Sequence, residues 1–152
     1  MDVKAILRLK GSAVYSVKPD APISEAVELM HEKRIGAVLV MEDDEGKIQG
    51  ILSERDIIGM VAQHTCTSLQ GVVSDAMTED VMACTADCTL DRVIAGMTKS
   101  RVRHLPVFEG DRLTGMVSAR DMMQYRIRQL ESGEEKRFQR WFPKGKVYRL
   151  GE

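Results

Sequence analysis

The chain has 152 residues, and its 22 lysines and arginines against 23 aspartates and glutamates give a formal net charge of -1. This balance excludes a protein whose overall field holds nucleic acid or an acidic membrane surface, so any anion-binding site must be local. The longest apolar run, at residues 35–41, is too short to cross a membrane, and the N-terminal residues contain no apolar stretch of signal length. We therefore expect a cytoplasmic protein without a membrane partner.

The first half of the chain predicts five elements from its apolar periodicity and its turn residues. Apolar residues recur with helical spacing at Ile23, Ala26, Val27 and Met30. Asp20 stands ahead of them as a candidate N-cap. In chain order we expect an extended segment at residues 14–17, this helix, strands at 37–41 and 48–52 joined by a turn at 42–47, and a helix at 54–64.

The second half predicts the same order of elements. Helical spacing recurs at Leu90, Val93, Ile94 and Met97, with Asp87 as the candidate N-cap. We expect an extended segment at residues 81–85, this helix, strands at 105–108 and 113–117 joined by a turn at 109–112, and a helix at 119–130. Each half is thus β-α-β-β-α, with too few strands to cover both faces of its sheet, so the two halves need each other to bury a core.

The remaining segments predict a linker and a tail. Residues 65–80 are small and mostly polar, and they separate a first domain at 4–64 from a second at 81–130. Residues 131–152 are basic, with four interleaved aromatics: Phe138, Trp141, Phe142 and Tyr148. Such a tail can stack single-stranded nucleic acid. We favour the commoner arrangement, in which the aromatics pack across a neighbouring surface and the charges stay in water.

The two halves also match residue by residue. Residues 22–56 align with residues 89–121 if two residues are deleted from the turn of the second copy. The offset is 67 before the turn, where Arg34 matches Arg101, and 65 after it, where the matched sets are Gly50, Ser53, Arg55, Asp56 and Gly115, Ser118, Arg120, Asp121. A duplication that retains the apolar spacing, a glycine and a terminal Ser-x-Arg-Asp indicates an internal structural repeat.

Two copies that each close on Gly-hydrophobic-hydrophobic-Ser-x-Arg-Asp resemble a tandem pair of CBS domains, the cystathionine β-synthase type module. Further markers are LRLKGSAVYSV at residues 7–17, SDAMT at 74–78 and RHLPV at 103–107. The resemblance is to the stand-alone bacterial type, since no barrel, channel or kinase domain is recognised beside the repeats. It implies an α/β (α+β) fold of two repeats packed sheet to sheet as a pseudo-twofold module with two clefts. It also implies a homodimer, a flat disc of four domains.

The resemblance further implies adenosine compounds as ligands: AMP, ADP, ATP, NAD(H) or S-adenosylmethionine. Asp56 and Asp121 would accept hydrogen bonds from ribose hydroxyls, and Ser53 and Ser118 would donate to phosphate. The candidate nucleotide-binding residues are Lys18, Ala21, Ala26, Gly36, Ala37, Ser53, Arg55, Asp56, Thr85, Cys88, Arg103, His104, Pro106, Ser118, Arg120 and Asp121. We expect no resident cofactor and no metal.

The two Ser-x-x-Asp turns also have a purely structural interpretation. A serine N-cap with an acid three residues later forms a capping box, and the acid favours the helix dipole without any ligand. A capped helix end nevertheless keeps N–H groups that point toward an anion. The same residues can serve both roles, and we favour nucleotide contact, more strongly at Asp121 than at Asp56.

The copies differ most where each enters its middle strand. The second copy has Arg103 and His104 there, and the first has Gly36 and Ala37. By the resemblance, this strand edge borders the phosphate end of the cleft that holds the same repeat's Ser-x-x-Asp. Arg103 would then present a guanidinium fork and His104 a further donor beside Asp121. The alternative is a solvated arginine and a packed histidine.

The opposite walls of the two clefts are expected to differ as well. By the resemblance, residues 18–26 would form the wall that faces Asp121, where Ala21 and Ala26 leave room for a flat base. Residues 84–93 would face Asp56, with Cys88 and Val93 in place of the alanines. We therefore predict two unequal clefts, one phosphate-competent at Asp121 and a poorer one at Asp56.

Catalysis has little support in the sequence. The histidines, His31, His64 and His104, lack partners at a spacing typical of a triad. The cysteines, Cys66, Cys84 and Cys88, lack the paired spacing of a zinc site and are expected to be reduced, partly buried thiols. We expect a regulatory, energy-sensing module that acts on a partner protein and is not an enzyme. The alternatives are a dimerisation protein with vestigial clefts and nucleic-acid binding through the tail.

Overall fold

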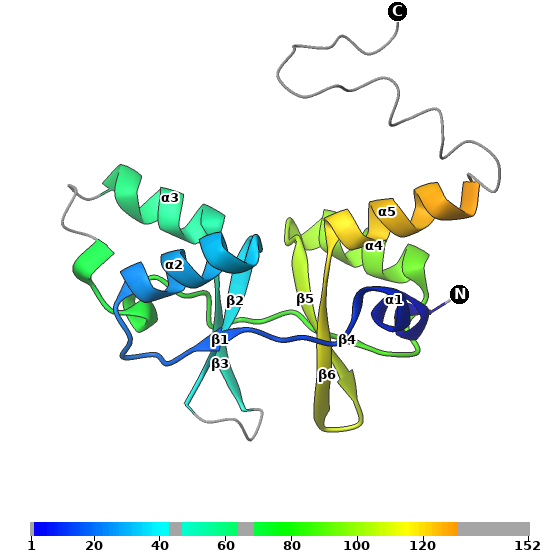
Figure 1. Cartoon of the computed structure of the whole chain (residues 1–152), viewed down its shortest axis with the longest axis horizontal. Helices are drawn as coiled ribbons and strands as arrows, with labels where there is room; N and C mark the ends of the chain where they lie inside the picture. The colour runs from blue at the N-terminus through cyan, green and yellow to red at the C-terminus, as the bar shows by residue number, and fades with distance from the viewer. Residues whose placement is uncertain (1, 43–46, 64–68, 131–152) are drawn as a thin grey trace, which may run out of the picture.

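A computed structural model of the chain describes residues 2–42, 47–63 and 69–130. After an N-terminal helix, α1 (Val3–Lys10), two similar units follow (Figure 1). The first comprises β1 (Ser16–Val17), α2 (Ile23–Lys33), β2 (Ala37–Met41), β3 (Ile48–Ser53) and α3 (Glu54–Gln63). The second comprises β4 (Cys84–Thr85), α4 (Leu90–Ser100), β5 (His104–Glu109), β6 (Arg112–Ser118) and α5 (Ala119–Leu130). The predicted order β-α-β-β-α is confirmed in both repeats.

The two three-stranded sheets have the same topology. The middle strand of each, β2 or β5, pairs in parallel with the preceding short strand and antiparallel with the following strand. The intervening helix makes the crossover that a parallel pair requires. The registers place Ala37 opposite Ser53 and His104 opposite Ser118. In each sheet, the start of the middle strand therefore lies beside the turn into the last helix.

Each repeat has its own core, and each core is completed from outside the β-α-β-β-α unit. The residues of β2 are all buried, as their unbroken apolar run predicts. Val73, in a short 3₁₀ helix η2 (Val73–Asp75), is fully buried in the first core. Val3 and Ile6 of α1 are buried in the second core. The N-terminal helix thus packs on the second repeat, while part of the predicted linker packs on the first.

Backbone hydrogen bonds fix both of these crossed segments. At α1, Val3 N donates to Cys88 O at 3.0 Å, and Lys4 N donates to Ala86 O at 2.8 Å. In the linker, Thr78 and Ile51 exchange two N–H···O bonds, each of 2.9 Å, so the chain runs beside β3 before it enters β4. Figure 1 shows the two sheets next to one another in the middle of the molecule, with the chain that joins α1 to β1 and the chain that leads into β4 crossing from one half to the other.

One helix was not predicted, and two N-caps were predicted at the wrong residues. No helix was expected at residues 3–10, although Val3, Ile6 and Leu7 have helical spacing and Asp2 caps the helix by accepting from Ala5 N at 3.0 Å. The N-caps of α2 and α4 are Pro22 and Thr89, and the predicted Asp20 and Asp87 lie two residues too early. The Asp87 side chain instead accepts a hydrogen bond from the Thr85 hydroxyl.

The structure describes the predicted turns, linker and tail to different extents. The turn at 109–112 is confirmed, with Gly110 at φ 61. The turn at 42–47 and the linker at 65–80 lie partly outside the described ranges. The tail at 131–152 lies wholly outside them, as do His64 and Cys66. Within the described ranges, no helix is long and apolar enough to span a membrane.

Candidate functional site

Each repeat holds a serine and an aspartate rigidly at the turn where its last strand enters its last helix. Asp56 Oδ2 accepts from Ser53 N at 2.8 Å and from Ser53 Oγ at 2.7 Å, and Ser53 Oγ accepts from Asp56 N at 3.4 Å. The corresponding distances for Asp121 and Ser118 are 2.7, 2.9 and 3.2 Å. These reciprocal bonds are those of a capping box. The structural interpretation of both turns is therefore confirmed.

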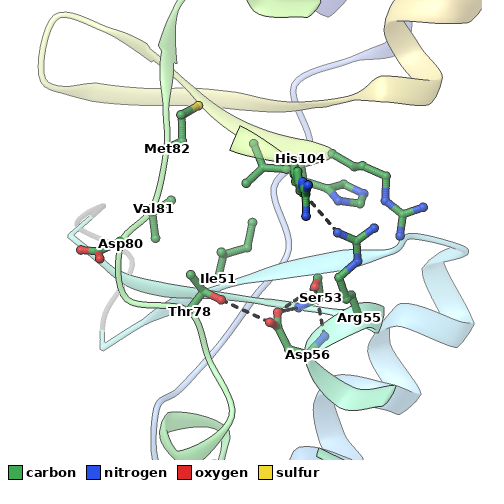
Figure 2. A pocket seen from close by; sticks show the side chains of 12 residues that line it. Ile51, Ser53, Arg55, Asp56, Thr78, Asp80, Val81, Met82 and His104 are labelled. Atoms are coloured by element: carbon green, nitrogen blue, oxygen red, sulfur yellow. Dashed lines mark hydrogen bonds between the residues drawn. The ribbon is translucent and has the colours of Figure 1, made fainter. Parts of the chain in front are cut away.

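A pocket opens beside Asp56, between the two repeats (Figure 2). Its volume is about 190 Å³. Its walls come from the β3–α3 turn, from the segment leading into β4 and from the segment leading into β5: Ile51, Ser53, Arg55, Asp56, Thr78, Asp80, Val81, Met82, Arg101, Val102, Arg103 and His104. Both repeats therefore contribute to this one site.

The lining changes from apolar to cationic across the pocket. Figure 2 shows Val81 and Met82 on one side and Arg55 on the opposite side, with Ser53 and Asp56 between them. The capping box holds Oδ2 of Asp56, and the hydroxyl of Thr78, another residue of the pocket wall, donates to Oδ1. A molecule bound here would meet an apolar wall, then a fixed carboxylate, then a positive rim.

Three arginines supply that rim. Arg55, Arg101 and Arg103 line the pocket together with two acids, Asp56 and Asp80, so its side chains carry a net positive charge apart from the histidine. The Arg55 guanidinium donates from Nη1 to the carbonyl oxygen of Arg101 at 3.3 Å. Arg101 ends α4 in the left-handed conformation, with φ 54, which costs a residue with a side chain about 1–2 kcal/mol. Guanidinium groups in such an array favour a phosphate or carboxylate ligand.

His104 lies where the two repeats meet. It is half-buried, and a Cβ added to Gly36 would come within 3.2 Å of its Cε1 atom, so the imidazole packs directly on the first repeat. Burial lowers the pKa of His104 below 6.5, and the surrounding charges act in both directions: Arg103 and Lys10 lower it, while Glu54 and Asp121 raise it. The imidazole is therefore neutral at pH 7, with one nitrogen donating and the other accepting.

The aspartate of the second repeat has a different neighbour. Lys10 Nζ, from the end of α1, lies 2.8 Å from Asp121 Oδ2, in an ion pair whose side chains are 33% and 18% exposed. At Asp56, by contrast, the added partner is a hydroxyl, and Thr78 Oγ1 donates to Oδ1 at 3.2 Å. The repeated turn thus has an ammonium group at one carboxylate and a neutral hydroxyl at the other.

Arg103 and His104 were predicted to border the cleft of Asp121, and that assignment stays a prediction. Both residues line the pocket of Asp56. The physical reason is that β5 begins at the boundary between the repeats, where His104 packs on Gly36 of the first repeat. His104 therefore lies near both turns: it lines the pocket of Asp56, and it also stands opposite Ser118, with Asp121 and Lys10 among the charges that act on it.

The residues of the predicted opposite walls are mostly packed inside the repeats, and their binding roles stay predictions. Ala21 and Ala26 are buried in the first core, with exposed fractions of 8% and 0%, so neither leaves a surface for a base. Cys88 packs against the second core beside α1, and Thr85 bonds to Asp87, so neither lines the pocket of Asp56. Helices α2 and α4 turn these faces onto their own sheets, and the shorter segments before the strands approach the aspartates instead.

The remaining predicted residues fall into two groups. Pro106 and Ala37 are buried strand residues with no surface available to a ligand. Lys18 is exposed in the loop after β1, and Arg120 is exposed on α5 near Asp121. Their binding roles stay predictions.

Several pocket residues were absent from the predicted set: Ile51, Thr78, Asp80, Val81, Met82, Arg101 and Val102. Two of them carried a signal in the sequence. Thr78 ends the SDAMT marker, and Arg101 matches Arg34 across the repeat. The others have no distinguishing pattern, because only the pairing of residues 78–82 with β3 brings them to the site.

The cysteines and metal-binding groups provide no reactive centre among the described residues. Cys84 and Cys88 are free thiols, as predicted, and burial, with a smaller contribution from Cys88, raises the pKa of Cys84 to about 11. In the described ranges, no three His, Cys, Asp or Glu side chains are grouped so as to hold a metal ion.

Comparison with known proteins identifies the architecture. The model of the CBS domain family matches twice, at residues 8–63 and 73–128. The chain therefore belongs to the CBS domain family, as a tandem pair of such domains. It is 42% identical to the CBS-domain protein ATU1752 from Agrobacterium tumefaciens, whose crystal structure superposes with a TM-score of 0.79 over 83% of this chain and 99% of that one.

Two further relatives extend this comparison. An uncharacterized 17.7 kDa protein from Acidianus ambivalens is 31% identical over 118 residues, which are 77% of this chain and 70% of that protein. The CBS domain pair of protein MJ0100, solved in complex with 5'-methylthioadenosine and S-adenosyl-L-methionine, is 25% identical. It superposes with a TM-score of 0.71 over 82% of this chain and 98% of that chain.

Proposed function

We propose that this chain is a regulatory binding module, not an enzyme, and that it binds an adenosine nucleotide in the Asp56 pocket. The order of the pocket's lining carries the proposal. The base would lie on the apolar wall at Val81 and Met82, and the ribose hydroxyls would donate to Asp56. The phosphates would then reach the rim of Arg101 and Arg103.

The energetics of this arrangement favour a nucleotide over a free base. A vicinal diol can donate two hydrogen bonds to a fixed carboxylate, each worth roughly 1.5–3 kcal/mol. The pocket's volume of about 190 Å³ is below the roughly 300–1,000 Å³ typical of ligand sites. A nucleotide would therefore extend over the rim toward the arginines, where a phosphate stays partly in water. The adenosine ligands of the MJ0100 pair support this ligand class.

A thermal-shift panel of AMP, ADP, ATP, NADH and adenosine tests the proposal. A ligand at about 100 times its dissociation constant stabilises the native state by roughly 2.7 kcal/mol, which is readily measured. Asp56→Asn is the matched control, since it keeps the shape of the side chain and removes its charge. We expect a shift with at least one phosphorylated ligand in the wild type and a much smaller shift in the variant. No shift with any compound would contradict the proposal.

Pairing of two chains would complete the module. The outer surfaces of the last helices expose large apolar side chains, Ile58 and Val61 on α3 and Met123 and Ile127 on α5. We propose that they are covered in a homodimer, a disc of four CBS domains, whose packing angle reports nucleotide occupancy to a regulated partner protein. Light scattering on the wild type and on Ile58→Glu tests the pairing: a dimer that becomes a monomer supports it, and a monomeric wild type contradicts it.

A further inference from the structure

The two aspartates are approached by chain segments that occupy equivalent positions. A Cβ added to Gly50 in β3 would lie 2.6 Å from Met77 Sδ, and one added to Gly115 in β6 would lie 2.8 Å from Leu7 Cδ2. Met77 and Leu7 thus pack on the same point of the two sheets. The glycines leave room for each segment to cross its sheet closely.

Beyond this shared contact the segments diverge. Residue 78 follows Met77 directly and brings a threonine hydroxyl to Asp56, while Lys10 lies one helical turn after Leu7 and brings an ammonium group to Asp121. The difference arises because the first segment pairs with β3 as extended chain and the second is helix α1. One repeat therefore has an internal cation in the place where the other has a hydroxyl.

This substitution changes what each carboxylate offers a ligand. The hydroxyl groups that donate to Asp56 are neutral, so they do not compensate its negative charge. The carboxylate can therefore attract the hydroxyl donors of a ligand. Asp121 Oδ2 already accepts from Ser118 N, from Ser118 Oγ and from Lys10 Nζ, the last at 2.8 Å. A ligand hydroxyl at Asp121 would therefore meet a carboxylate that is only 18% exposed and whose charge Lys10 already compensates.

The rims differ in the same sense. The repeat alignment matches Arg103, at the pocket of Asp56, with Gly36 on the other side. The position in the first repeat that corresponds to Arg103 is therefore a glycine, which offers no cation to a phosphate beside Asp121.

We propose that Lys10 is the residue that restricts this module to one nucleotide site, by occupying the cleft of Asp121 from within the chain. This inference rests on the nucleotide site proposed at Asp56. It assigns the N-terminal helix a second role besides packing on the second core: its last turn supplies the cation that closes the cleft of Asp121.

Isothermal titration with ADP, which counts sites per chain, tests the proposal in four full-length proteins. They are the wild type, Lys10→Met, Lys4→Met and Asp56→Asn/Lys10→Met. Lys4→Met is the matched control, because Lys4 lies on the same helix and makes a similar ion pair, of 2.7 Å with Glu109, outside both clefts. Methionine keeps an unbranched side chain, one heavy atom shorter than lysine, and removes the charge in each case. Val3 and Ile6, which anchor α1, are unchanged.

We expect one equivalent of ADP for the wild type and for Lys4→Met, and two for Lys10→Met. The double variant should bind one equivalent, now at Asp121. If Lys10→Met still binds one equivalent, or if the wild type already binds two, the role of Lys10 is overturned while the site at Asp56 stands. If the wild type binds none and Lys10→Met binds one, the role of Lys10 stands and the site at Asp56 fails. If no protein binds ADP, both fail.

Discussion

The turns at Asp56 and Asp121 contain the same capping box, yet different chain segments pack beside them. At Asp56, residues 78–82 and the entry to β5 form a pocket with an apolar wall and three arginines. At Asp121, the lysine that ends α1 pairs with the carboxylate. Two repeats can therefore have the same scaffold and still form unequal sites, because each site also depends on the chain segment that packs beside the repeat.

The largest expected effect comes from the two sheet glycines. A Cβ at Gly50 meets the Thr78 carbonyl oxygen at 2.9 Å as well as Met77, whereas a Cβ at Gly115 meets only the flexible end of Leu7. Overpacking against backbone typically costs 1–3 kcal/mol. We expect Gly50→Ala to lower the free energy of unfolding by about 1–3 kcal/mol and to weaken ADP binding, and Gly115→Ala to cost less than about 1 kcal/mol. If urea unfolding shows the same loss of stability for Gly50→Ala and Gly115→Ala, the two contacts do not differ as proposed.

The next effect concerns the phosphate end of the pocket. Arg103→Ala should weaken ADP roughly 10-fold or more, the loss of one charge-assisted hydrogen bond, while adenosine binding changes little. Arg120→Ala, at the other cleft, should leave both ligands almost unaffected. Titration calorimetry measures the two affinities. Equal losses for ADP and adenosine in Arg103→Ala would exclude a phosphate role for this arginine.

His104 should make stability depend on pH in a direction that its burial determines. Its folded pKa is lowered, so below about pH 6.5 the unfolded chain binds more protons than the folded chain and stability falls as the pH falls. One such group cannot change the free energy of unfolding by more than about 1.4 kcal/mol per pH unit. The variant His104→Ala places the alanine of the first repeat, Ala37, at this position. We expect its stability, measured by urea unfolding between pH 7.5 and 5.5, to lack the pH dependence that His104 contributes.

The opposite pH dependence would contradict the effect of burial on His104. A wild type whose stability relative to His104→Ala rises on acidification would mean that the carboxylates of Glu54 and Asp121 outweigh burial at this position. The added nucleotide gives a second check. Phosphate beside His104 favours the imidazolium, so ADP should reduce the pH dependence.

The smallest effect separates conformational strain from binding. Arg34 and Arg101 end equivalent helices with φ 55 and 54, a conformation that glycine adopts without strain. Replacing either arginine with glycine should stabilise the fold by up to about 1 kcal/mol, after the entropy of glycine in the unfolded chain is deducted. Only Arg101→Gly should also weaken ADP. A loss of affinity in Arg34→Gly would contradict the assignment of the site to one cleft.

The sequence predicted the scaffold because the scaffold depends on local pattern. Apolar spacing determined the helices from Ile23 and Leu90, and the β-rich runs determined the strands. The turns at Ser53 and Ser118 were predicted as capping boxes because their bonds join residues three apart in the chain. All of these contacts lie within one repeat, where a linear pattern contains the necessary information.

The site was predicted less well because it depends on contacts between repeats. Aligning Arg103 with Gly36 correctly identified a difference between the copies, but alignment cannot say which aspartate the arginine faces. The structure shows that it lines the pocket of Asp56. The ion pair between Lys10 and Asp121 was not predicted for the same reason, because the two residues meet only after α1 packs on the second core.

We propose that Asp56, not Asp121, is the nucleotide-binding aspartate of this chain. Calorimetric titration of Asp56→Asn and Asp121→Asn with ADP tests it most directly, since both changes keep the side chain's shape at the same kind of turn. We predict that Asp121→Asn retains wild-type affinity and that Asp56→Asn loses roughly 10- to 100-fold, as removal of a charged hydrogen-bond acceptor requires. Loss of binding in Asp121→Asn, with Asp56→Asn unaffected, would contradict the account.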